Sequence, residues 1–169
     1  MKRLAMLLGL GLAATGVLHA EDAGNNMDAA TRRVLLDVMV APIHSKAELD
    51  SYLETHPDSP IHRLGASAME SFLESLVFAR KGLGSYSYTE LEGMPASDVY
   101  QILALFGLQS DTGSIRRKRS LSEDDRMVES QFRRSNPPRS PNRACWVIPN
   151  SPGGCHPDPG RRCSAICPR

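Results

Sequence analysis

Two amphipathic segments between residues 66 and 108 constrain the fold more than any other feature of the chain. In residues 66–80, large apolar side chains recur at the spacing of an α-helix: Met69, Phe72, Leu73, Leu76 and Val77. Residues 95–106 repeat this pattern with Val99, Ile102, Leu103 and Phe106. Gly82 and Gly107 follow the two segments, and glycine is common just after a helix C-terminus. The pattern predicts two helices packed through their apolar faces.

Two further helices are predicted upstream. Asp28 can cap a helix over residues 29–40, and Pro42 stops it. Ser45 and Glu48 form a capping box that begins a helix running to about residue 56. We therefore predict an all-α fold, a small bundle of about four short helices within residues 21–109. Residues 84–94 are expected to be a connector containing one short turn.

Charge and composition separate this bundle from the rest of the chain. Residues 21–109 contain 13 acidic and 6 basic residues, a net charge of −7, whereas residues 110–169 contain 6 acidic and 12 basic residues, a net charge of +6. Residues 110–143 are rich in Ser, Arg and Pro and lose the apolar period, although Ser122 could begin a short helix. They predict a disordered basic linker, and residues 144–169 predict a small disulfide-bonded module.

The N-terminus predicts export. Lys2 and Arg3 precede an uncharged apolar run over residues 4–17, and a small residue, Ala20, follows it. This arrangement is typical of a signal peptide over residues 1–20, with cleavage between Ala20 and Glu21. The alternative, a membrane anchor, needs about 20 apolar residues, and this run is shorter. We expect a secreted or periplasmic mature chain without a transmembrane segment.

The four cysteines all lie within the last 25 residues. An even number of cysteines in an exported chain predicts two disulfides, with three pairings open. The residues concerned are Cys145, Cys155, Cys163 and Cys167. One alternative is a tail without defined structure whose disulfides only limit proteolysis. The other is a metal site that uses the cysteines, with or without His156, but zinc ligands usually come in closely spaced pairs and only Cys163 and Cys167 do so. No metal or cofactor is predicted.

A basic run lies between the acidic and the cysteine-bearing parts. Its four residues are Arg116, Arg117, Lys118 and Arg119. They suit a solvated linker, a protease processing site or a patch that contacts anionic surfaces. The order of signal, acidic segment, basic run and cationic cysteine segment is similar in layout to precursors of secreted peptides. Against processing, the acidic part has regular helices that a discarded segment would not need, and Cys145 lies 26 positions beyond Arg119.

Catalysis and nucleic-acid binding have little support in the sequence. His44, His56 and His62 fall at predicted helix boundaries, where loop or capping roles are more common than catalysis, and no hydrolase or phosphate-binding motif is present. The tail has few aromatic residues for stacking on bases, only Phe132 and Trp146. No catalytic residue is predicted, and nucleic acid is an unfavoured partner.

The sequence therefore predicts an exported, non-enzymatic interaction protein. The helical domain would be the platform, and the basic tail would contact an unknown protein or an anionic cell-surface polymer. The first alternative is a precursor that releases a cationic, disulfide-bonded peptide by cleavage near residues 116–119. The second alternative is a hydrolase with an unrecognised site.

Overall fold

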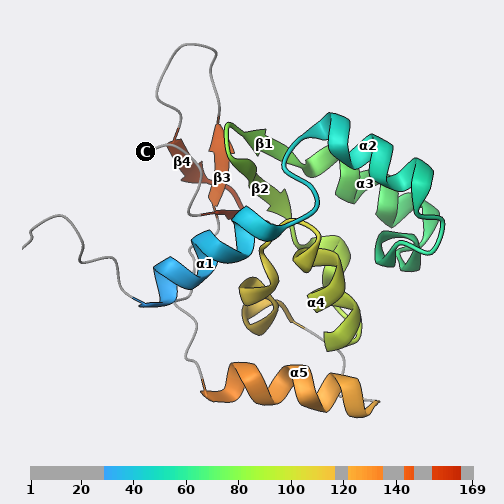
Figure 1. Cartoon of the computed structure of the whole chain (residues 1–169), viewed down its shortest axis with the longest axis vertical. Helices are drawn as coiled ribbons and strands as arrows, with labels where there is room; N and C mark the ends of the chain where they lie inside the picture. The colour runs from blue at the N-terminus through green and yellow to red at the C-terminus, as the bar shows by residue number, and fades with distance from the viewer. Residues whose placement is uncertain (1–28, 117–121, 135–142, 147–153, 165–169) are drawn as a thin grey trace, which may run out of the picture.

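Helices and two antiparallel sheets together form the fold (Figure 1). The computed structural model describes residues 29–116, 122–134, 143–146 and 154–164. The elements in chain order are α1 (Ala29–Val40), α2 (Lys46–Thr55), η1 (Pro60–Arg63), α3 (Ala66–Ser75), β1 (Val77–Ala79), β2 (Gly82–Ser87), η2 (Thr89–Leu91), α4 (Ala96–Ala104), η3 (Gln109–Ser114), α5 (Glu123–Arg134), β3 (Arg143–Trp146), β4 (Gly154–Pro157) and β5 (Arg161–Cys163), where η marks a short 3-10 helix. One sheet has the order β1-β2-β5, and the other pairs β3 with β4. The protein is thus mixed α/β, and the all-α prediction is wrong.

Helices α1 and α2 have the limits that the local sequence predicts. The Ser45 hydroxyl oxygen accepts a hydrogen bond from the Glu48 backbone N–H at 3.2 Å. In return, the Glu48 carboxylate accepts one from the backbone N–H of His44 at 2.7 Å. These contacts satisfy backbone donors that the first turn of a helix leaves unpaired. Capping chemistry within a few residues is enough to place the start of α2.

The last residues of the third predicted helix instead form the first strand and the turn of a β-hairpin. Helix α3 ends at Ser75, and β1 pairs with β2 through a two-residue turn at Arg80 and Lys81. The Ser75 hydroxyl donates to the Phe72 carbonyl at 2.7 Å and accepts from the Ser87 backbone N–H at 2.9 Å. This long-range contact ties the end of α3 to β2. A short apolar run such as residues 76–79 suits either a helix or a strand, so its periodicity alone does not distinguish the two.

Strand β2 occupies the segment that the sequence predicted to be a connector. All six of its residues are buried. Figure 1 shows β1 and β2 with α2 and α3 to one side and with β3 and β4 on the other. The strand is also central in its sheet, since β1 pairs along one edge and β5 along the other. Because other elements lie on both sides of β2, there is little room for large side chains at several of its positions. Its glycines and serines fit there and are buried.

Helix α4 ends one turn before Gly107, whose backbone φ is +72°. A Cβ atom at this position would lie 2.4 Å from the Cα of Val38 in α1. The glycine therefore supplies both a left-handed conformation and the room for α1 to cross the end of α4. This close approach brings Val38 into the core, where it is 3% exposed.

Part of the predicted disordered linker is folded. Helix η3 overlaps the start of residues 110–143, and α5 is the short helix that Ser122 could begin, so disorder does not extend over the whole segment. Helix α5 lies beneath α4 in Figure 1. Its Asp125 is 1% exposed, and the Phe132 ring packs so closely on Gly113 that a Cβ there would lie 3.0 Å away. These contacts come from α4 and η3, so tertiary packing supplies what the local sequence lacks.

The core joins α-helical and β-strand side chains. The ring of Phe72 lies 6.5 Å from those of Tyr86 and Phe106, both in edge-on geometry. Edge-to-face contacts of this kind add a favourable term to the burial of aromatic surface. The three rings come from α3, β2 and the end of α4, so the core depends on the hairpin as much as on the helices.

Candidate functional site

The most distinctive feature of the molecule is the basic strand β5 on the edge of β2. Antiparallel pairing sets Ser85 opposite Cys163, Tyr86 opposite Arg162 and Ser87 opposite Arg161. Backbone hydrogen bonds between the two segments continue beyond both ends of this strand pairing. The backbone N–H of Tyr88 donates to the Gly160 carbonyl at 2.9 Å, and that of Ser164 donates to the Gly84 carbonyl at 2.7 Å. The same geometry lets proteins bind extended peptides by strand addition, but here the strand belongs to the same chain.

Arg162 carries the most unusual environment in the site. Its side chain is 6% exposed, and Nη2 donates to the Ser114 carbonyl at 3.0 Å. The guanidinium carbon lies 5.2 Å from the centre of the Tyr88 ring, within the range of a cation–π interaction. We call the residues around it, Tyr86, Tyr88, Asp111 and Ser114, the arginine socket.

Two donors of this buried cation have no hydrogen-bond partner among the described residues. They are the Nε and Nη1 groups of Arg162. A buried donor without a partner costs about 1–3 kcal/mol, and more for a charged group. A well-packed apolar side chain of similar volume would avoid this cost, so the arginine points to recognition rather than to packing alone.

Tyr86 and Asp111 form the floor of the arginine socket. The Tyr86 hydroxyl donates to Oδ2 of Asp111 at 2.9 Å. Burial raises the pKa of Asp111, although the Tyr86 hydrogen bond and the positive charge of Arg162 act in the opposite direction. Burial also raises the pKa of Tyr86 well above its usual value, and the neighbouring carboxylate adds to this effect. The Tyr86 hydroxyl is therefore a neutral hydrogen-bond donor. Burial disfavours the charged form of the Asp111 carboxyl group.

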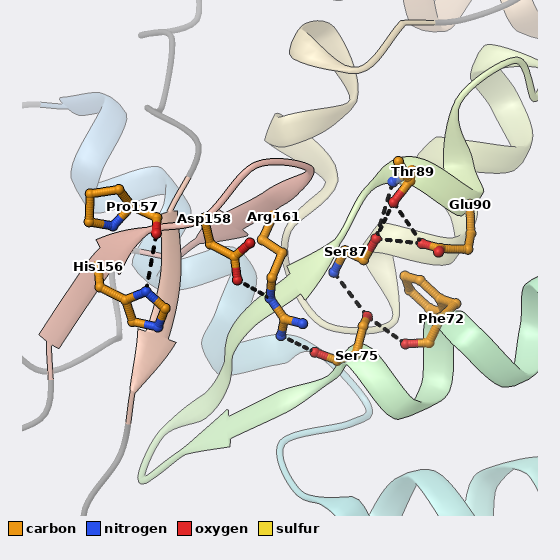
Figure 2. Close-up of polar contacts among 9 residues, drawn as sticks. All are labelled: Phe72, Ser75, Ser87, Thr89, Glu90, His156, Pro157, Asp158 and Arg161. Atoms are coloured by element: carbon orange, nitrogen blue, oxygen red, sulfur yellow. Dashed lines mark hydrogen bonds and ion pairs between the residues drawn. The ribbon is translucent and has the colours of Figure 1, made fainter.

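A second polar network surrounds Arg161 (Figure 2). Its Nη2 donates to the Ser75 carbonyl, and its Nε faces Oδ2 of Asp158 at 3.6 Å. From Ser75 the network continues to Ser87, whose hydroxyl donates to the Glu90 carboxylate at 2.6 Å. The Ser87 oxygen also accepts from the Thr89 backbone N–H at 3.3 Å. A serine that bonds to residues two and three positions on closes a turn, so this cluster shapes the end of β2.

A disulfide holds β5 to β4. Cys155 in β4 is bonded to Cys163 in β5, with the two Cα atoms 6.1 Å apart, which confirms the predicted disulfide bonding and settles this pairing. Cys145 is also disulfide-bonded and is 4% exposed. A Cβ at Gly84 would lie 2.8 Å from the Cys145 sulfur. The absence of a side chain at Gly84 thus lets β3 lie close against β2.

Several predicted site residues lie outside the described part of the chain: Ala20, Glu21, Arg117, Lys118, Arg119 and Cys167. Arg116 is described and exposed, and its carbonyl accepts a hydrogen bond from the backbone N–H of Gly93 at 3.0 Å. The structure thus joins Cys155 to Cys163 and anchors the start of the basic run.

The predicted helix-boundary histidines have local roles in the described structure. The Nε2 atom of His44 lies 2.8 Å from the Val38 carbonyl oxygen, and His56 stacks on Tyr52 with ring centres 4.0 Å apart. His62 is exposed. Within residues 29–116, 122–134, 143–146 and 154–164, no group of three or more His, Cys, Asp or Glu residues is placed to hold a metal ion. Over the same residues, no helix has the length and apolar character needed to cross a membrane.

Sequence reasoning missed the arginine socket. Tyr86 and Tyr88 stand out in the sequence as an alternating pair, and Arg161 and Arg162 directly precede Cys163. Their pairing depends on a strand contact between distant segments, which no local pattern encodes. Comparison of the chain with protein-family models, with curated proteins and with solved structures found no match.

Proposed function

We propose that this chain is an exported, non-enzymatic interaction protein. The mixed α/β body is the platform, and the C-terminal segment is anchored to it through β5. In the sequence, the basic run at residues 116–119 falls between these two parts, and it contacts an anionic surface or partner. One observation carries the proposal: Arg162 is buried in the arginine socket of the body while β5 extends its sheet.

The position of the tail cations supports this division of roles. Arg161 and Arg162 are engaged in contacts with the body, so they are not available to an outside partner. Arg116, by contrast, is exposed at the start of the basic run. Basic groups that are exposed and closely spaced contact anionic surfaces most strongly. We therefore infer that residues 116–119, four basic residues in succession, make the contact.

The precursor alternative is weakened by the same contacts. A peptide released by cleavage near residues 116–119 would have to withdraw Arg162 and detach β5 from β2. Intact mass spectrometry of the secreted product distinguishes the two functions. A chain that begins near Glu21 and still contains the C-terminal cysteines supports the proposal, and a tail fragment as the sole product overturns it.

Replacing the basic run tests the proposed contact. The variant carries Arg116→Gln, Arg117→Gln, Lys118→Gln and Arg119→Gln, and the matched control carries Arg32→Gln, Arg33→Gln, Lys46→Gln and Arg126→Gln, all exposed positions elsewhere. Each basic residue near an anionic surface contributes about 1 kcal/mol, so binding to vesicles containing anionic lipid should fall by roughly two to three orders of magnitude. Added salt should weaken wild-type binding.

The control variant identifies non-specific charge effects. It should retain most of the wild-type affinity, because it changes the net charge equally without touching residues 116–119. Equal losses in both variants would show that net charge alone causes binding. Absence of wild-type binding to both anionic vesicles and an anionic cell-wall polymer would remove the proposed contact.

A further inference from the structure

We infer that residues 122–164 are a ligand that residues 29–116 recognise at two separate sites without needing the peptide link between them. A chain cut within residues 117–121 would then remain a complex of two fragments. The inference goes beyond the proposed function, because it concerns what a cleaved chain does and holds whether or not cleavage occurs in nature.

The first site is the N-terminal end of α4. Pro95 precedes this helix and offers no side-chain cap. Asp125 of α5 takes that role, since its Oδ1 accepts hydrogen bonds from the backbone N–H and the hydroxyl of Ser97 at 3.0 and 2.9 Å. Its Oδ2 accepts from the backbone N–H of Ser122 at 3.1 Å, which fixes the carboxylate in place. A carboxylate at a helix N-terminus satisfies free donors and interacts favourably with the helix dipole.

The second site is the β2 edge with the arginine socket. Strand β5 supplies the paired backbone, and the arginine socket receives the Arg162 side chain. The Ser164 hydroxyl adds a hydrogen bond to the Leu83 carbonyl at 2.8 Å. Specificity comes from Arg162, because the backbone contacts would accept any extended segment while the arginine socket presents a carboxyl group, a carbonyl and a tyrosine face.

Two sites on one fragment reinforce each other. Once α5 is docked, β5 is held near β2, so its binding becomes effectively intramolecular. The charges also favour association, since residues 29–116 carry 11 acidic and 7 basic residues and residues 122–164 carry 5 acidic and 7 basic residues. Cleavage of the basic run removes none of these contacts. Release of the tail therefore requires a further event, such as a competing ligand.

A site-specific cut tests the inference directly. Residues 117–121 of the full chain are replaced by a protease recognition sequence, and the purified protein is cut and examined by size-exclusion chromatography and native mass spectrometry at about 10 µM. The expected result is one species containing both fragments at a 1:1 ratio. Separation of the fragments at this concentration would overturn the inference.

Variants of the same cleavable chain assign the contact. Arg162→Ala should weaken fragment association at least about tenfold, since a hydrogen bond to a charged group contributes about 1.5–3 kcal/mol. Arg126→Ala is the matched control, because Arg126 is exposed and pairs with Glu123 in its own helix. It should associate as the wild type does. An Arg162→Ala complex as tight as the control would overturn the role of the arginine socket.

Folding of each variant is checked before the cut by circular dichroism. If Arg162→Ala does not fold, Arg162→Lys replaces it, because lysine keeps the charge and loses the planar donor array. That variant should still bind more weakly than the control after cleavage, and equal binding would contradict the inference. The secreted mass does not enter this experiment, so its outcome is separate from the proposed function.

Discussion

At the scale of single residues, the buried charges of the arginine socket set the chemistry of this protein. Arg162 is 6% exposed and has two donors without a hydrogen-bond partner among the described residues, and burial raises the pKa of the nearby Asp111 carboxyl group. Unpaired buried charge lowers stability. The arginine socket is therefore where stability and recognition are in conflict, and where substitutions and pH should have the clearest effects.

The raised pKa of Asp111 predicts how the folded state responds to pH. Because the pKa in the folded chain lies above the ordinary value of 3.8, the native state binds this proton more tightly than the unfolded state. The contribution of Asp111 to the free energy of unfolding should rise as pH falls through its folded pKa towards about 3.8. Asp111→Asn resembles the protonated form, so its stability advantage at pH 7 should shrink as pH falls.

Thermal unfolding between pH 4 and 7.5 measures this effect. Asp50→Asn is the control, since Asp50 is exposed and pairs with Lys46 on the helix surface. It reports how far the loss of an exposed carboxylate by itself alters stability over the same range. A difference between Asp111→Asn and wild type that stays constant across pH would contradict the prediction.

At the scale of elements, local chemistry places some boundaries and distant contacts place others. The capping pair Ser45 and Glu48 fixes the start of α2 within four residues of sequence. The end of α3, by contrast, depends on Ser75 meeting Ser87 of β2. Helix α5 has few apolar residues, and its contacts with α4 and η3 hold it in place. The sequence prediction was wrong at the end of α3, where the boundary depends on a distant contact.

The cap that α5 provides for α4 can be tested by substitution. Asp125→Ala removes two hydrogen bonds from Ser97 and should lower the free energy of unfolding by about 1–3 kcal/mol. Asp125→Asn keeps one acceptor oxygen and should cost less. Urea unfolding gives both values.

Asp124→Ala serves as the reference for this measurement. Asp124 is the exposed neighbour in the same helical turn, so its loss should change stability by only a few tenths of a kcal/mol. Equal effects of Asp125→Ala and Asp124→Ala would show that the buried cap contributes nothing.

At the scale of the whole molecule, the C-terminal segment completes the fold of the body. Strand β5 covers an edge of β2 that would otherwise expose unpaired backbone groups, and exposed edges favour unwanted strand pairing. The Cys155–Cys163 disulfide fastens β5 to β4. Body and cysteine segment thus share one sheet, although their sequences differ strongly in composition.

Removing this disulfide should loosen β5 more than the rest of the molecule. A Cys155→Ser, Cys163→Ser chain loses a bridge between residues 8 positions apart, for which chain entropy predicts about 2–3 kcal/mol. Hydrogen exchange at the β5 amides should accelerate at least about tenfold, while α2 amides should change much less, because local opening needs less free energy than global unfolding. Equal acceleration in β5 and α2 would contradict this prediction.

The sequence by itself determined the features that depend on neighbouring residues. These are the limits of α1 and α2, the short turn after β2, the left-handed glycine after α4, and the disulfide bonding of the cysteine segment, although not its pairing. Capping, backbone conformation and cysteine content act over a few residues or through composition, so they can be predicted without a fold.

Only the tertiary structure decided that the chain is mixed α/β. The apolar stripe of residues 66–80 divides between α3 and β1, and a stretch of glycines, serines and Tyr86 becomes a fully buried strand. The arginine socket exists only where β2, η3 and β5 meet, so Arg162 had no signal as a site residue beyond its charge. Strand pairing and burial of a cation depend on segments far apart in the chain, and their free energies come from contacts that no local pattern contains.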